Sequence, residues 1–434
     1  MHISEIHSSP TTTTREREAA GEKMGRRSGS KRKKARTSPG AGGDRITVLP
    51  LELRARIASL LDFRQVVQLS TLSRPWRHIH HHTPVVKLSL YGFISFTGED
   101  SFPHLFDDDA ILGMRVALGR RAEDAHGSKV DTLDLRYFVD CARLRRHADR
   151  IIALADARKV RVTIPSGGHA WQNAWTLDLP PAALKLEVVA SGHLAPSVVG
   201  PAAAALRGLC LHCVVLSEWP SLPSLRSLSL TSVTVKAPFP PGDRWPLLEN
   251  LFIFNAEIEQ ARVDIRLPHL KTLNMDGLDL IPHGDFDDGS PFGDVTVDAP
   301  ELEELGVNCW TGGSCSDYRS FTLRAPRLRS LSWYSQPAGR VDIDVGTPGG
   351  VTAGTIEFSW IEEDACGELK GYKAQIMRML EGLLPELSPE RVADAVRPHM
   401  RVGKYAVEDI LTDEMIMEER LTCDLNAVMS SLEV

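Results

Sequence analysis

The chain has 434 residues, of which 42% are apolar, and its formal net charge at pH 7 is −7. No apolar run approaches the roughly 18 residues that a membrane helix needs, and the N-terminal residues lack the apolar core of a signal peptide. The seven cysteines are odd in number and scattered, which is typical of a reducing compartment. We therefore expect a soluble intracellular protein without disulfides and without a membrane partner.

Residues 1–43 contain almost no large apolar residues, so they offer too little burial to offset the entropy of ordering. We predict a disordered basic tail, with ten Lys and Arg against four Asp and Glu. The cluster Lys31, Arg32, Lys33 and Lys34 favours nuclear import, and a solvated tail is the plainer alternative. Nucleic acid is not expected as a partner, because no aromatic residues that could stack on bases are interleaved. The expected location is nuclear, cytoplasmic or both.

The stretch 44–79 is predicted to form three short helices. Apolar residues at helical spacing mark the first of them, and these are Leu49, Leu53, Ile57 and Leu60. Pro50 suits the first turn of that helix, where its missing N–H costs nothing. Leu69 and Leu72 belong to a second stripe, and Trp76 to a third.

Three such helices bury too little apolar surface to stand alone. Apolar surface left over on them is therefore expected to be a docking face for a partner. The alternative is that these helices only cap the rest of the chain.

The order Asp44-Arg45-Ile46, Leu49-Pro50, Leu72-Ser73-Arg74 and Trp76-Arg77 resembles the F-box of plant F-box proteins. In that family the F-box binds the small Skp adaptor, which links it to a cullin scaffold, and the assembly is a ubiquitin ligase. The resemblance places an F-box at residues 44–82. The residues that it implies as adaptor contacts are Leu49, Pro50, Leu53, Ile57, Leu60, Leu69, Leu72 and Trp76. Pro75 departs from the family, which usually has Arg or Lys at that position.

Residues 83–361 contain a recurring Leu-x-x-Leu-x-Leu frame, typical of leucine-rich repeats. The frame starts at Leu206, Leu225, Leu248, Leu270, Leu302 and Leu328, and weaker versions include Val86-Leu88-Leu90, Val130-Leu133-Leu135, Val160-Val162-Ile164, Leu184-Leu186-Val188 and Ile356-Phe358-Trp360. Each phrase predicts a short strand followed by a returning segment, and stacked phrases give a curved parallel sheet. Residues 108–122 and 141–158 look helical. No asparagine recurs after the strands, which predicts an irregular solenoid.

Side chains along a strand alternate between two faces, so the residues between the core leucines should lie on the concave face. We predict target binding there, through Ser229, Phe252, Asn274 and Ser332.

Patterns for metal binding and catalysis are weak. The acidic insertion 282–289 lacks the glutamate that a calcium loop requires, and Cys210 and Cys213 have no second cysteine pair nearby. No phosphate loop, nucleophile elbow or zinc-protease motif occurs. We therefore expect no catalytic residue, no metal, no cofactor and no enzymatic activity in this chain.

Residues 362–434 are predicted to close the end of the repeat stack as a helical cap. The apolar stripe between Leu369 and Leu383 predicts one helix, and Ser388-Pro389 predicts the start of another. This segment resembles the C-terminal part of grass F-box proteins with leucine-rich repeats.

The expected fold class is α/β: a three-helix F-box, an irregular leucine-rich-repeat horseshoe built as a parallel-sheet solenoid, and a helical C-terminal cap. The expected function is that of a substrate receptor in a Skp-cullin-F-box ubiquitin ligase, with an unknown target protein as second partner. Two alternatives remain: a repeat-based interaction scaffold outside any ligase, and a receptor whose concave face holds a small molecule that glues a target in place.

Overall fold

The computed structural model describes residues 46, 48–72, 74–95, 105–165, 173–280, 293–308, 310–311, 314–315, 318–335, 338–346, 350–359, 365–402, 405–406 and 420–432. The chain divides at residue 45, and all the elements below belong to Ile46–Val434. The basic cluster Lys31 to Lys34 and the acidic insertion 282–289 lie outside the described residues.

Two short α-helices open the described chain: α1 Leu51–Ala58 and α2 Phe63–Leu72. The third predicted helix is instead a pair of 3-10 turns, η1 Arg74–Trp76 and η2 Ile79–His81. Pro75 lies inside the first of these turns, where it has no backbone N–H to donate. These elements share a small core of their own, made of Ala55, Ala58, Val66, Trp76 and Ile79.

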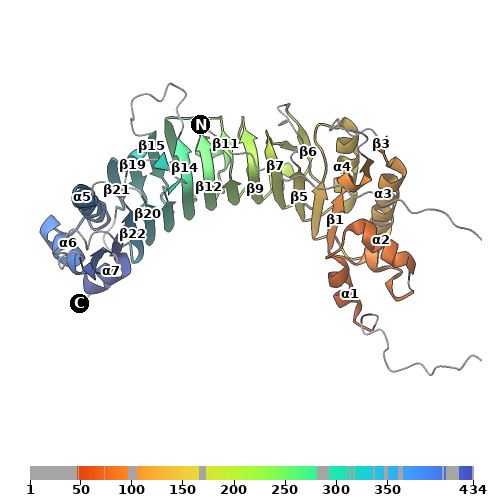
Figure 1. The fold of residues 1–434 in the computed structure, drawn as a ribbon, viewed down its shortest axis with the longest axis horizontal. Helices are drawn as coiled ribbons and strands as arrows, with labels where there is room; N and C mark the ends of the chain where they lie inside the picture. The colour runs from red at the N-terminus through yellow and green to blue at the C-terminus, as the bar shows by residue number, and fades with distance from the viewer. Residues whose placement is uncertain are drawn as a thin grey trace, which may run out of the picture. The chain divides into compact units, whose positions relative to one another are not determined.

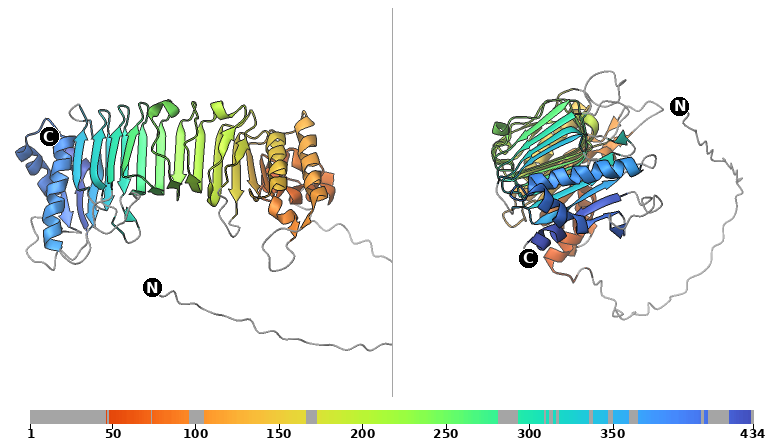
Figure 2. Two further views of the ribbon diagram at one scale, coloured as in Figure 1. Left: turned by 90° about the horizontal axis from the view of Figure 1, so that it is seen from above. Right: turned by 90° about the vertical axis from the view of Figure 1, so that its left-hand side faces the viewer.

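The described residues that follow form mainly a parallel-strand solenoid, in which one strand from each turn joins a single long sheet (Figures 1 and 2). In order across the sheet the strands are β1 Val85–Ser89, β4 Thr132–Arg136, β5 Lys159–Ile164, β7 Lys185–Leu194, β9 Gly208–Leu216, β10 Ser227–Thr231, β12 Asn250–Ile258, β14 Thr272–Leu280, β16 Glu304–Asn308, β20 Ser330–Ser335 and β22 Ala353–Ser359. The short β11 Thr234–Val235 pairs with β9 and β12.

The strand register matches the sequence prediction. Leu228 pairs with Leu251, which pairs with Leu273, then Leu305 and Leu331, and all five are buried. The weaker frames at 86–90, 130–135, 160–164, 184–188 and 356–358 also lie on or beside strands of this sheet. The core therefore runs along one face of the sheet, behind the paired leucines.

Returning segments form a second sheet that the sequence did not predict. Its four parallel strands are β13 Arg262–Arg266, β15 Gly293–Asp298, β19 Tyr318–Arg324 and β21 Arg340–Asp344. Shorter pairs occur elsewhere: β2 Ile94–Ser95 with β3 Leu105–Phe106, β6 Thr176–Asp178 with β8 Ser197–Val199, and β17 Trp310–Thr311 with β18 Ser314–Cys315.

At corresponding places within strands β9, β12 and β14, and directly after β10, one residue adopts a left-handed backbone conformation. These residues are Cys213, Ser232, Asn255 and Gly277, with φ angles of 54°, 51°, 51° and 66°. Only glycine adopts this conformation without steric cost. The backbone conformation is thus repeated at this position although the residue type is not.

Helices α3 Asp108–Glu123 and α4 Ala142–Ala155 lie near the β1 end of the sheet, close to their predicted ranges (Figure 1). The Asp107 side chain accepts a hydrogen bond from the Ala110 N–H and so caps α3. Among the described residues, no helix is both long and apolar enough to cross a membrane.

The other end carries α5 Ala365–Leu383, α6 Pro389–Val396 and α7 Leu425–Leu432 (Figure 1), together with η6 Arg397–His399. Ser388 caps α6 as predicted. The cap is not purely helical, however, because β25 Arg420–Asp424 pairs antiparallel with β22 and continues through β23 Met400–Val402 to β24 Tyr405–Ala406. The predicted C-terminal cap therefore contains strands as well as helices.

Candidate functional site

Large apolar side chains are unusually exposed on the N-terminal helices. Seven of the fifteen exposed ones that the structure describes lie between residues 46 and 72, and these are Ile46, Val48, Leu51, Leu53, Ile57, Leu60 and Leu72. Leu60 and Leu72 are 74% and 79% exposed. Clustered exposure of this kind marks interaction sites in soluble proteins.

On helix α1 large apolar residues are exposed, whereas two alanines are buried. Leu53 and Ile57 are spaced by four residues on α1, and Leu60 follows two residues after the helix ends; we call these three exposed side chains the α1 apolar face. Ala55 and Ala58 are buried against the small helical core. The apolar stripe that predicted this helix therefore consists mainly of exposed side chains, not of core residues.

The remaining predicted adaptor residues differ in exposure. Pro50 is exposed, whereas Leu49 and Leu69 are half-buried. The Trp76 ring is only 8% exposed and lies in the small core, where it supports the helices from within.

Polar contacts attach this helical segment to the solenoid. The buried Arg121 side chain, on α3, donates to the carbonyl oxygens of His80, Thr83 and Ser128 at 2.7, 2.6 and 2.8 Å, and to the Thr83 hydroxyl at 2.9 Å. Burial lowers the pKa of Arg121 to about 10, so it stays charged at neutral pH. The four hydrogen bonds offset the cost of burying that charge.

A second contact joins His81 to Asp124. The ring nitrogen Nδ1 of His81 lies 2.6 Å from the carboxylate of Asp124. The backbone N–H of His126 and the His81 side chain lower the pKa of Asp124. Burial, together with the neighbouring His81 and His78, lowers the pKa of His80 to about 4. His80 therefore stays neutral at physiological pH.

On the main sheet, the predicted target residues form one continuous row. Ser229 pairs with Phe252, Phe252 with Asn274, Asn274 with Gly306, and Gly306 with Ser332. All lie on the outer face, away from the paired leucines, and Phe252 is 38% exposed. The predicted alternation is therefore confirmed for these strands.

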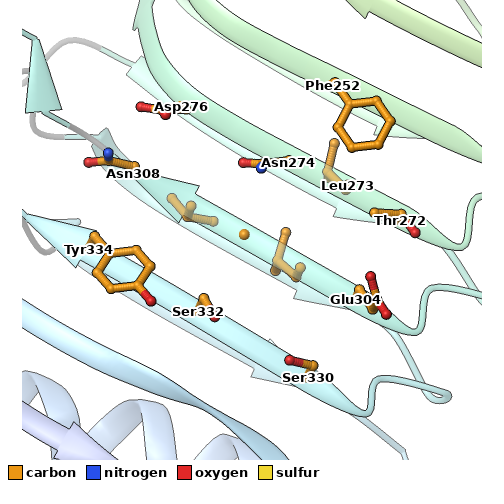
Figure 3. A pocket seen from close by; sticks show the side chains of 13 residues that line it. Phe252, Thr272, Leu273, Asn274, Asp276, Glu304, Asn308, Ser330, Ser332 and Tyr334 are labelled. Carbon is orange, nitrogen blue, oxygen red and sulfur yellow. The ribbon is translucent and has the colours of Figure 1, made fainter.

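This row crosses a groove of about 450 Å³ on strands β12, β14, β16 and β20 (Figure 3), which we call the sheet groove. Its lining residues are Phe252, Thr272, Leu273, Asn274, Asp276, Glu304, Leu305, Gly306, Val307, Asn308, Ser330, Ser332 and Tyr334. Ser229 lies on the same face but is not part of this lining.

Several lining residues escaped the sequence prediction, notably Asp276, Glu304, Asn308 and Tyr334. They stand two residues before or after the predicted row on the same strands. Extending the alternation by one step along each strand would have found them.

The charged residues of the described lining are both acidic, namely Asp276 and Glu304. Burial raises the pKa of Asp276, and a hydrogen bond with Asn308 opposes that shift. Within the described ranges, no group of three or more His, Cys, Asp or Glu is placed to hold a metal ion. The groove lining offers carboxylates, amides, hydroxyls and two aromatic rings to a ligand.

The fold and these surfaces define a class: an α/β solenoid of parallel strands, with an exposed apolar helix face near one end and a polar groove on the outer face of its sheet. Comparisons of the chain with protein-family models, with curated proteins and with solved structures found no match.

Proposed function

We propose that this chain is the substrate-receptor subunit of a Skp-cullin-F-box ubiquitin ligase. In this proposal, residues 44–82 are an F-box that docks the Skp adaptor, and the solenoid is a set of leucine-rich repeats that binds the target protein. Ubiquitin transfer belongs to the partner subunits, because a receptor acts by holding the target close to the transfer enzyme.

The observation that carries the proposal is the exposure of the α1 apolar face, where Leu53, Ile57 and Leu60 are 45%, 40% and 74% exposed. Burying one Leu or Ile side chain is worth roughly 1.5–3 kcal/mol, so a partner that covers this face gains substantially. The resemblance of the sequence to an F-box names the Skp adaptor as that partner.

Of the two alternatives, an interaction scaffold would use the same groove without an adaptor. A small-molecule receptor is less favoured, because small-molecule sites are mostly apolar and enclose their ligand. The sheet groove is lined largely by polar side chains and is open along the sheet face (Figure 3). A protein segment suits it better.

The test is native affinity purification of the full chain, with the Skp adaptor and a cullin as the proteins sought. The double variant Pro50→Ala and Leu53→Ala should weaken adaptor binding at least about a hundredfold while the solenoid stays folded. The matched control is Leu112→Ala with Val116→Ala on α3, which removes apolar surface that is 48% and 44% exposed at another place.

Adaptor binding should survive in the control variant. If the Pro50 and Leu53 variant binds the adaptor as well as the unchanged chain does, the ligase assignment fails. The scaffold then becomes the better explanation.

A further inference from the structure

The sheet groove combines negative charge with aromatic rings. Asp276 and Glu304 lie in it without any Lys or Arg among the described lining residues. Phe252 and Tyr334, each 38% exposed, stand on β12 and β20, the outermost strands of the groove. Carboxylates attract cations, and aromatic faces bind cations as well, so the lining is complementary to a basic ligand.

Gly306 has no side chain, so the middle of the groove is open above its backbone. It pairs with Asn274 on one side and with Ser332 on the other. A Cβ atom at this position would lie 3.1 Å from the Asn274 Oδ1 atom, closer than an ordinary contact. Glycine inside a strand is typical of places where another backbone comes close to the sheet.

The two carboxylates lie on opposite sides of this glycine along the strand direction. Glu304 is two residues before Gly306 on β16, and Asp276 pairs with Asn308, two residues after it. Two residues of strand span roughly 7 Å. One cation at the glycine therefore cannot contact both carboxylates, whereas two side chains that point in opposite directions can.

An extended peptide has this geometry, because successive side chains point to opposite sides. Between β12 and β20 there are three strand spacings, or roughly 14 Å, which about four extended residues cover. The groove thus fits a short extended segment that runs across the strands.

We propose that the sheet groove binds an extended segment of the target protein that carries two adjacent basic residues, with its backbone over Gly306. One basic side chain pairs with Glu304 and the other with Asp276. Arginine fits better than lysine, because a planar guanidinium binds a carboxylate through two hydrogen bonds and also stacks on Phe252 or Tyr334. This inference deepens the proposed function by giving the target's chemistry, and it rests on that function only in taking the ligand to be a protein.

The probe is a fluorescein-labelled nonapeptide of Gly and Ser with Arg-Arg at its centre, titrated with the purified full-length chain and read by fluorescence anisotropy. Matched peptides carry Lys-Lys, citrulline-citrulline or Glu-Glu instead. We expect the order of affinity Arg-Arg, Lys-Lys, citrulline-citrulline, with no binding of Glu-Glu. Raising the ionic strength to about 0.5 M should weaken binding of the Arg-Arg peptide, because partly exposed ion pairs are screened.

Asp276→Asn and Glu304→Gln should each weaken binding of the Arg-Arg peptide about threefold to tenfold, as expected for partly exposed ion pairs. Gly306→Val should abolish it by filling the centre of the groove. The matched control is Glu257→Gln, which neutralises an exposed carboxylate on β12 outside the groove lining and should leave binding unchanged. Thermal unfolding checks that every variant is folded.

The proposal is overturned if the Arg-Arg peptide does not bind, if Glu-Glu binds equally well, or if the Asp276 and Glu304 variants bind like the unchanged chain. None of these results depends on the adaptor. A chain that binds the peptide but not the adaptor retains this site and loses the ligase assignment, and the converse result loses only the site.

Discussion

On helix α1 the large apolar side chains lie outside and the alanines inside, whereas on strands β10 to β20 the large apolar side chains lie inside and mostly polar ones outside. Leu53 and Ile57 are at least 40% exposed, but Leu251 and Leu273 are fully buried. Both segments follow the periodicity of their secondary structure. Periodicity therefore identifies two faces, and the surrounding chain decides which of them is the core.

The two regions also differ in how they are stabilised. The solenoid core continues from turn to turn, so each strand is covered by its neighbours. The helical segment has its own small core, and it is joined to the solenoid by the Arg121 hydrogen bonds and by Phe63, which is buried in the solenoid core. A segment with so little internal burial is the part of the fold that gains most from a partner.

The largest difference in stability should appear when the same substitution is made in each region. Leu273→Ala removes a fully buried side chain and should lower the free energy of unfolding by roughly 2–5 kcal/mol. Leu60→Ala removes one that is 74% exposed and should change it by less than about 0.5 kcal/mol. Chemical denaturation of the two variants measures the difference. Equal losses would contradict the outward placement of the α1 apolar face.

Arg121→Met tests the connection between the two regions. It removes four hydrogen bonds and leaves buried carbonyl oxygens unsatisfied, each at a cost of roughly 1–3 kcal/mol. We expect a loss of about 3 kcal/mol, with the helical segment exchanging its amide hydrogens faster than the distant strands. Hydrogen exchange measures this difference.

The control for that variant is Arg121→Lys, which keeps the charge but cannot reach all three carbonyls with one ammonium group. Its stability and its rate of hydrogen exchange should lie between those of the unchanged chain and those of Arg121→Met. A uniform rise in exchange along the whole chain would mean that Arg121 supports the solenoid in general and not this connection.

The sequence predicted the main sheet because its frame is repeated and its residues are strongly apolar, as at Leu228, Leu251 and Leu273. It missed the second sheet because strands such as Arg262–Arg266 lie outside the repeated leucine frame and carry just two buried residues, Val263 and Ile265. Alternation over so few residues is weak. Their strand geometry is fixed by stacking on the next turn.

The C-terminal strand β25 was missed for the same reason. Leu421 and Cys423 alternate correctly and are fully buried, but the segment is short and stands directly before helix α7.

For the sheet groove, alternation along the strands predicted the face on which it lies but not the groove itself. Its depth depends on Gly306 lying between Asn274 and Ser332, which is a consequence of strand register.

Acid should lower the stability of the folded chain through protonation of His80. In the folded chain its pKa is about 4, against 6.5 for the free side chain, so between these values the folded chain binds fewer protons than the unfolded one. The free energy of unfolding should therefore fall as the pH drops from about 6.5 to 4 and should not depend on this group above that range. The variant His80→Phe keeps a ring without the titration.

Denaturation of both chains at several pH values measures the effect, and the difference between them should change steadily across that window. A constant difference would show that His80 does not contribute to the pH dependence. Asp124, whose pKa is lowered, remains in both chains and adds its own loss at lower pH without altering the comparison.

The smallest effect on stability is expected for Phe252→Asp. Phe252 is the neighbour of Leu251 in the chain, yet it points to the outer face and is 38% exposed, whereas Leu251 is fully buried. The substitution should change the free energy of unfolding by about 0.5 kcal/mol or less, while Leu251→Asp should prevent folding because it buries an unpaired charge. The positively charged variants Phe252→Lys and Asn274→Lys, which repel the proposed basic segment, should lose the target protein and keep the adaptor. If Phe252→Asp unfolds the chain, the strand register is wrong by one residue; if the two lysine variants still bind the target, recognition lies outside the sheet groove.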